Sequence, residues 1–265
     1  MSSYMDEVFA PIDRDWQLER IAGGNETEVY CTDDGRFVVK LKHDLGGTRE
    51  HALAHAKSMR AAAEQYIECL GERYTIPSYY MLARDSAGRV QTVVVQPYLQ
   101  GGRALFGVDY AALNEDERHA LAADLREIIR RSLSYYRATG SMPDLYGRSS
   151  GSTAERARQK SLAMLPRRLW SFLVQRNLLT AHNLVLTPAP ERRVVLVDYD
   201  FVRRGRLYRM VYFIVRWMLF WRDHTLIMLL RRGKAPAAAT APAPTPGAPS
   251  PASEELALAT LEHGA

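Results

Sequence analysis

The sequence predicts an α+β fold with two lobes, in which a small antiparallel sheet carrying one helix precedes a mainly helical lobe. Before residue 100, short β-like runs with Gly-bearing turns surround a single long stretch of helix formers. After residue 113, apolar residues recur at helical spacing, with one later pair of β-like runs. The expected divisions are an N-terminal extension at 1–15, the small lobe at 16–100, the larger lobe at 101–233 with a basic insertion at 148–176, and an Ala/Pro-rich disordered tail at 234–265.

The small lobe is predicted from β-rich runs and from the residues that start and stop its helix. Its first strands are expected at residues 16–21, 28–32 and 36–42. A helix then begins after Thr48, whose hydroxyl can cap the first turn, and Gly71 stops it. The runs at 75–85 and 89–99 are separated by a short Ser-Ala-Gly turn, so they predict a hairpin.

The larger lobe is predicted to open with a long helix. Asn114 and Glu117 are spaced as a capping box, and Gly140 follows the last residue with helical periodicity. The remaining elements are expected to be a basic helical stretch at 154–176, two β-like runs at 182–187 and 194–202, and an aromatic, arginine-rich helix or helix pair at 207–231.

Cysteine usage and the N-terminal composition predict a cytoplasmic protein. Cys31 and Cys69 form no C-x-x-C pair and stand near no histidine cluster, so we expect free thiols in a reducing compartment. The first residues carry acidic side chains and no apolar core, which does not fit a signal peptide. The histidines show no spacing typical of zinc or haem ligands.

Positive charge is concentrated in two late segments, although the net charge of the chain is only +5. Residues 148–176 have a net charge of +6 and residues 203–234 a net charge of +8, whereas the tail is acidic. Such blocks favour anionic partners, and a solvated arginine-rich surface is the equally weighted alternative. Nucleic acid is not an expected partner, because there is no recognition-helix motif and no basic excess over a whole domain.

A glycine-containing loop precedes a lysine-bearing strand. The stretch IAGGNETEVY contains Gly23, Gly24 and Val29, and the strand FVVKLK that follows contains Lys40. Glycines let backbone N–H groups approach phosphate oxygens, and a lysine on the next strand can bind the same phosphates. A simple β-turn explains the loop on its own, and Lys42 shares a strand face with Lys40, so both alternatives stay open.

Two later segments carry oxygen ligands. Asn183 lies in AHNLVLT, and Asp198 follows the apolar run VVLV fifteen residues further on. Amide and carboxylate oxygens are hard ligands that suit magnesium bridging phosphates, whereas a surface turn is the alternative for Asp198. Asp144 follows the long predicted helix in SMPDLYG, where a Pro-Asp turn dipeptide is the simpler interpretation.

These motifs, in this order, resemble the protein-kinase-like fold that protein kinases share with small-molecule kinases such as aminoglycoside phosphotransferases. The resemblance covers roughly residues 16–215, and small bacterial kinase-like proteins, including lipopolysaccharide-core types, are most similar in size. It implies that Lys40 holds nucleotide phosphates and that Glu50 pairs with Lys40. The further nucleotide-binding residues implied are Gly23, Gly24, Val29 and Gln96.

The resemblance also implies that Asp144 orients or deprotonates an acceptor hydroxyl and that Asn183 and Asp198 bind Mg²⁺. Glu64 and Asn177 are rivals for the places of Glu50 and Asn183. The chain departs from the family in keeping one of three loop glycines and in having Leu178 where the local pattern places an aspartate. The basic segment 148–176 would then be an insertion within the catalytic loop.

The resemblance therefore implies an ATP- and Mg²⁺-dependent phosphotransferase that acts on the hydroxyl of a small-molecule or lipid-linked acceptor. No A-P-E-like segment follows Asp198, so a protein substrate is not expected. The alternative is a catalytically inactive pseudokinase that serves as a regulatory or membrane-surface module, which the departures in the loops favour.

The segment at 207–231 has two interpretations. Its arginines and Asp223 interrupt the apolar run, so it does not read as a simple membrane-spanning helix. The pattern predicts either a core helix whose arginines reach the surface or a helix that docks on a membrane. Under the second interpretation, residues 203–232 form a peripheral contact with the inner face of the membrane.

Overall fold

A computed structural model describes the parts of the chain that form the fold. These are residues 19–23, 27–42, 48–84, 88–143, 145–146, 176–199 and 206–234. Over these residues the protein is α+β, with two antiparallel sheets and three α-helices. The N-terminal extension, most of the basic segment 148–176 and the Ala/Pro-rich tail lie outside the described residues.

The larger sheet has five strands in the order β1-β2-β3-β5-β4, each antiparallel to its neighbours. The strands are β1 (Glu19–Gly23), β2 (Thr27–Cys31), β3 (Phe37–Lys42), β4 (Tyr79–Arg84) and β5 (Val90–Pro97). Gly35 has a φ of 64° in the turn between β2 and β3, a conformation that glycine adopts without steric cost. Cys31 and Cys69 are free thiols, as the sequence predicts, and both are buried.

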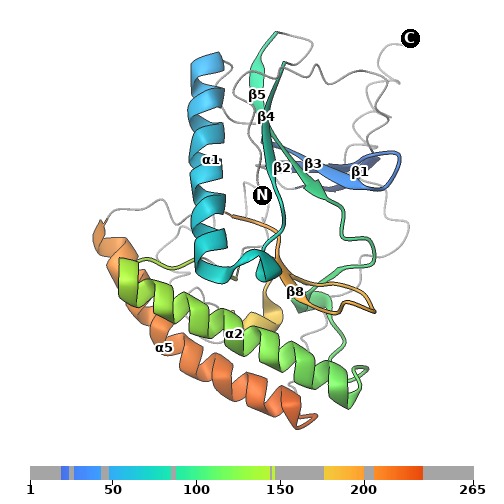
Figure 1. Cartoon of the computed structure of the whole chain (residues 1–265), viewed down its shortest axis with the longest axis vertical. Coiled ribbons are helices and arrows are strands. Elements are labelled where there is room, and N and C mark those ends of the chain that lie inside the picture. The colour runs from blue at the N-terminus through green and yellow to red at the C-terminus, as the bar shows by residue number, and fades with distance from the viewer. Residues whose placement is uncertain are drawn as a thin grey trace, which may run out of the picture.

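Helix α1 (Arg49–Leu70) lies along one face of this sheet (Figure 1). Thr48 accepts a hydrogen bond from the N–H of His51, and Gly71 ends the helix with a φ of 79°, so both predicted helix ends are confirmed. Its buried face is rich in alanine, which allows close approach to the strands. The hydroxyl of Thr92 on β5 donates to the carbonyl of Ala52 at 2.9 Å.

Helices α2 (Glu115–Thr139) and α5 (Arg206–Arg231) lie side by side below the sheet (Figure 1). The predicted capping box at the start of α2 is present, since Asn114 and Glu117 each bond the other's backbone N–H. The core between the helices and their neighbours contains the buried side chains Leu121, Leu125, Ile128, Ile129, Phe213, Phe220 and Ile227.

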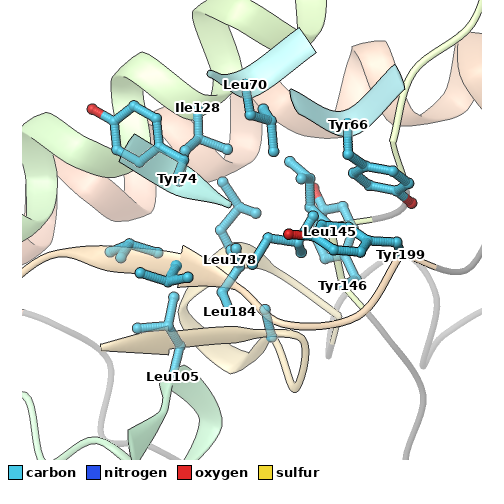
Figure 2. Packing of buried hydrophobic residues seen from close by; sticks show 14 of the residues in the cluster. Tyr66, Leu70, Tyr74, Leu105, Ile128, Leu145, Tyr146, Leu178, Leu184 and Tyr199 are labelled. Atoms are coloured by element: carbon cyan, nitrogen blue, oxygen red, sulfur yellow. The ribbon is translucent and has the colours of Figure 1, made fainter. Parts of the chain in front are cut away.

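A three-stranded sheet connects the helices to the larger sheet. Its strands are β6 (Arg103–Ala104), β7 (Leu184–Leu186) and β8 (Val194–Leu196). Asp124 of α2 accepts hydrogen bonds from the Val194 N–H and from Arg73 and Tyr74, which follow α1. Figure 2 shows Leu70, Tyr74, Ile128, Leu178 and Leu184 packed in this region. One buried carboxylate thus joins α2, β8 and the end of α1.

Glu127 on α2 forms ion pairs close to the point where α2 meets the end of α1. Its carboxylate accepts hydrogen bonds from Arg130 and Arg131, and Arg131 also donates to the last carbonyl of α1 at 2.9 Å. The hydrogen bonds from Arg130 and Arg131 lower the pKa of Glu127 from 4.5 to about 2. A carboxylate with a lowered folded-state pKa contributes stability above the unfolded pKa and loses it as pH falls.

We therefore expect Glu127→Gln to lower the free energy of unfolding by roughly 1 kcal/mol at pH 7. The difference from wild type should shrink as pH falls from about 4.5 toward 2, because wild-type Glu127 becomes protonated over that interval. Urea midpoints measured at pH 7 and at pH 3 test this. A difference that stays constant with pH would show that the charge of Glu127 contributes nothing.

Candidate functional site

Lys40 lies in the middle of β3, on the sheet face that α1 covers. Its direct neighbours across the strands are Val29 on β2 and Val94 on β5. Directly opposed residues in antiparallel strands share a face, and Val94 belongs to the buried cluster that includes α1 alanines. Lys40 itself is half-buried. The side chain of its rival Lys42 lies outside the described residues.

The ammonium of Lys40 reaches the segment that follows β8. Its Nζ donates a hydrogen bond of 2.8 Å to the carbonyl of Val197, which is 157 residues away in sequence. Val197 directly precedes Asp198. The strand lysine and the aspartate motif, which the sequence keeps far apart, therefore lie at the same place in the fold.

Asn183 lies at the same end of the β7–β8 hairpin as Asp198. The two strands are antiparallel, so the residue before β7 lies near the residues that follow β8. Leu184 opposes Leu196 at this end of the β7–β8 ladder, and the Val197 N–H extends the ladder by donating to the Asn183 carbonyl at 3.0 Å. Asn183 and Asp198 thus leave the hairpin at its open end. Both residues are half-buried.

Tyr199 fixes the other side of Asp198. Its hydroxyl donates to the Ile76 carbonyl at 2.6 Å and accepts from the Ile76 N–H at 2.7 Å. Its ring lies 5.3 Å from the ring of Tyr66 on α1, and the two side chains are adjacent in Figure 2. Burial raises the pKa of Tyr199, so its hydroxyl stays protonated at neutral pH. Asp198 therefore sits between two residues whose positions are set by hydrogen bonds.

The turn after α2 approaches the residue before Asn183. The His182 N–H donates to the Tyr146 carbonyl at 3.1 Å, and the His182 ring stacks on Phe106 with centroids 4.1 Å apart. Burial, followed by the nearby charge of Arg176, lowers the pKa of His182 and favours its neutral form. Asp144 lies outside the described residues, whereas Leu145 and Tyr146 are described and buried.

No protein-family model matches this chain, and no curated protein matches it either. In the described parts of the chain, no group of three or more His, Cys, Asp or Glu side chains is arranged to hold a metal ion. At the end of the β7–β8 hairpin that Lys40 contacts, Asp198 carries a carboxylate and Asn183 carries an amide.

Other sequence-predicted residues stand apart from Lys40. Glu50 is exposed in the first turn of α1, and within the described residues no ion pair joins it to Lys40. Its rival Glu64 pairs with Arg60 on the helix surface at 2.9 Å. The described buried residues of α1 include no carboxylate.

The predicted nucleotide-binding residues have mixed placements. Gly23 ends β1 opposite Glu28, Val29 lies beside Lys40, and Gly24 lies outside the described residues. Gln96 is buried on β5, and its amide donates to the Ser78 hydroxyl at 2.8 Å. Asn177, the rival of Asn183, closes the short 3-10 turn Leu178–Thr180 by bonding Thr180. Its placement fits a structural role.

Sequence reasoning missed the part played by Tyr199 and by the buried cluster that joins Tyr146 to Asp223 on α5. An aromatic residue directly after Asp198 was visible in the sequence, but its partner Ile76 is 123 residues away. Residues 207–231 form one helix whose Tyr212, Phe213 and Phe220 are buried, so the core interpretation holds for one face. Within the described residues, no helix is long and apolar enough to cross a membrane.

We expect Tyr199→Phe to lower the free energy of unfolding by about 1–3 kcal/mol, because the buried Ile76 N–H and carbonyl lose a partner. Tyr110→Phe is a matched control, since the Tyr110 hydroxyl is likewise buried against backbone groups, the carbonyls of Leu105 at 2.8 Å and Leu179 at 2.6 Å. Thermal denaturation compares the two. Only Tyr199→Phe should also weaken any ligand binding at Asp198, and equal effects on binding would contradict the anchoring role.

Proposed function

We propose that this chain is a two-lobed, kinase-like phosphotransferase that uses ATP and Mg²⁺ to phosphorylate a hydroxyl of a small-molecule or lipid-linked acceptor. The observation that carries the proposal is the 2.8 Å hydrogen bond from Lys40 to Val197, which brings a cation beside Asp198. Phosphoryl transfer depends mainly on positioning and charge neutralisation, and this site combines a cation with oxygen ligands.

The order and packing of the elements support the kinase-like architecture. The sheet is followed by helices and a β-hairpin, and α1 stands between β3 and β4 in sequence and against the sheet in space. In this interpretation the five-stranded sheet with α1 is the small lobe, and α2, α5 and the β7–β8 hairpin belong to the larger lobe. The nucleotide then binds where Lys40 meets Asp198.

The donor set fits magnesium. The Asp198 carboxylate and the Asn183 amide are hard oxygen ligands, and half-burial leaves access for phosphate oxygens and water to complete the coordination. Bound Mg²⁺ would neutralise phosphate charge during transfer. Lys40 would hold phosphate oxygens, and the hydrogen bonds of Val197 and Tyr199 would keep Asp198 in place. Asp144 is proposed to orient the acceptor hydroxyl.

A regulatory protein that binds nucleotide without turning it over is the second candidate. The observation that favours it is the exposed position of Glu50 together with the absence of a carboxylate from the described buried face of α1. An exposed Glu50 departs from the Lys40–Glu50 pair that the resemblance implies. The loss of two loop glycines points the same way.

Thermal denaturation with ATP, in the presence and absence of Mg²⁺, tests the proposed site. A ligand at a hundredfold excess over its Kd stabilises the folded state by about 2.7 kcal/mol. We expect a Mg²⁺-dependent rise in Tm that Asp198→Asn abolishes. Asp109→Asn is the matched control, because the Asp109 carboxylate is exposed and accepts a hydrogen bond from the Ala111 N–H in a loop.

The outcomes separate the candidates. A Mg²⁺-dependent shift together with ADP production supports the phosphotransferase, whereas a shift without ADP production supports the regulatory protein. No shift under any condition, with wild type and variants folded by circular dichroism, would contradict both.

A further inference from the structure

Helix α5 has two apolar faces, of which one is buried and the other exposed. Eight of the ten large apolar side chains that are exposed among the described residues lie on this helix. They recur at intervals of three and four residues, so they form one stripe. We call this the α5 stripe: Leu207, Met210, Val211, Ile214, Trp217, Met218, Trp221 and Met228.

The α5 stripe is long and strongly exposed. It runs from Leu207 to Met228, about 31 Å at the rise of an α-helix. Leu207 is 72% exposed and Trp221 is 68% exposed. Figure 1 shows α5 along the lower edge of the helical part, beside α2. Single exposed apolar residues are normal on protein surfaces, whereas a contiguous stripe of this length is typical of a docking surface.

Charge around the α5 stripe indicates what it binds. Asp223 is the one acidic residue in the sequence of α5, and it is 1% exposed, so it presents no charge to a partner. Exposed cations stand at both ends of the helix: Arg206 and Arg209 at the start, and Arg231, Arg232 and Lys234 at the end. The surface is therefore apolar along its length and basic at both ends.

A second copy of the chain matches this surface poorly. Two-fold pairing of α5 with itself places each basic end beside a basic end of the other copy, whether the helices run parallel or antiparallel. No carboxylate on the exposed face of α5 would offset that repulsion. An anionic lipid surface, in contrast, offers negative charge along the whole helix and an apolar layer beneath it.

We propose that α5 docks this protein on an anionic membrane surface, with the helix axis parallel to the membrane plane. The buried face of α5 stays packed on the core, while the α5 stripe enters the headgroup region. Trp217 and Trp221 suit that depth because indole rings favour the boundary between apolar and polar layers. This inference does not rest on the proposed phosphotransfer, since it uses no residue of the candidate site.

Co-sedimentation of the full chain with lipid vesicles tests the proposal. We expect binding to vesicles of phosphatidylcholine mixed with phosphatidylglycerol, weak binding to phosphatidylcholine alone, and loss of binding as salt is raised. Trp217→Ser and Trp221→Ser should each lower the partition coefficient roughly tenfold or more. Reversing both terminal charges in Arg231→Glu/Arg232→Glu should also lower it roughly tenfold or more.

Tyr98→Ser is the matched control, because Tyr98 is an exposed aromatic residue outside α5 and its loss should leave binding unchanged. Circular dichroism establishes that each variant folds. The proposal would be overturned if the wild-type chain did not bind vesicles. It would also be overturned if both tryptophan variants bound them as strongly as wild type. A concentration-dependent dimer in analytical ultracentrifugation that Trp221→Ser dissolves would overturn it as well, since a second copy would then cover the stripe.

Discussion

Replacing Asp223 with alanine is expected to lower the free energy of unfolding by about 3–5 kcal/mol. Asp223 is 1% exposed. Its carboxylate accepts two hydrogen bonds from Arg222 and one from the Tyr146 hydroxyl. Arg216, which is 2% exposed, lies over the Tyr146 ring at 3.7 Å. Removing the carboxylate leaves positive charge in the interior without its counter-charge, and that cost exceeds the value of any one hydrogen bond.

Urea unfolding monitored by circular dichroism measures this effect. Thr225→Ala is the control on the same helix, because Thr225 is exposed and its loss should change stability by less than about 0.5 kcal/mol. Tyr146→Phe should lower the free energy of unfolding by an intermediate amount, about 1–3 kcal/mol, since it removes one hydrogen bond and keeps the ring beneath Arg216. If Asp223→Ala cost no more than Tyr146→Phe, the buried charges would not be coupled as the geometry indicates.

The ends of the helices were predictable because they depend on local chemistry. A cap needs a side chain that reaches its own first turn, as at Thr48 and Asn114, and a glycine that adopts positive φ, as at Gly71 and Gly140. These signals lie within a few residues of the structure they determine. The coarse α+β class follows from the same local patterns, and α1, α2 and α5 begin and end near their predicted bounds. The strand predicted at 194–202 is shorter, since β8 ends at Leu196, and most of the helical stretch predicted at 154–176 lies outside the described residues.

The candidate site was predictable only in part, because its residues meet through contacts that are long-range in sequence. The resemblance placed Lys40, Asn183 and Asp198 together, and the bond from Lys40 to Val197 spans 157 residues. The register of α1 on the sheet is set by which face of the helix packs best. Alanines and Tyr66 occupy that face, which leaves Glu50 in solvent.

The charges of α5 were misjudged for the same reason. In the sequence, Arg216 and Asp223 look like breaks in an apolar run, and arginine more often reaches the surface than stays buried. The fold buries both beside Tyr146, a residue outside α5. Periodicity reports that a helix has apolar faces, but it does not identify the face that another element covers.

Lys40→Met is expected to slow ATP turnover by roughly 10²–10³-fold if the proposed site is correct, as for the loss of one preorganised charge-stabilising donor. Methionine preserves much of the length of the lysine side chain and removes its charge and its bond to the Val197 carbonyl. Because Lys40 is half-buried, we expect only about 1 kcal/mol of lost stability. ADP release with Mg²⁺ and water as the acceptor measures the rate.

Lys42→Met is the matched control, because Lys42 is two residues further along β3 and the alternation of side chains along a strand predicts the same face for both lysines. Slow ATP turnover by Lys40→Met, together with a wild-type rate for Lys42→Met, would assign phosphate binding to the lysine that contacts Val197. The reverse result would transfer the role to Lys42. Equal, wild-type rates in both variants would show that turnover does not pass through this strand. The Val197 contact of Lys40 would then be a structural link between the two sheets.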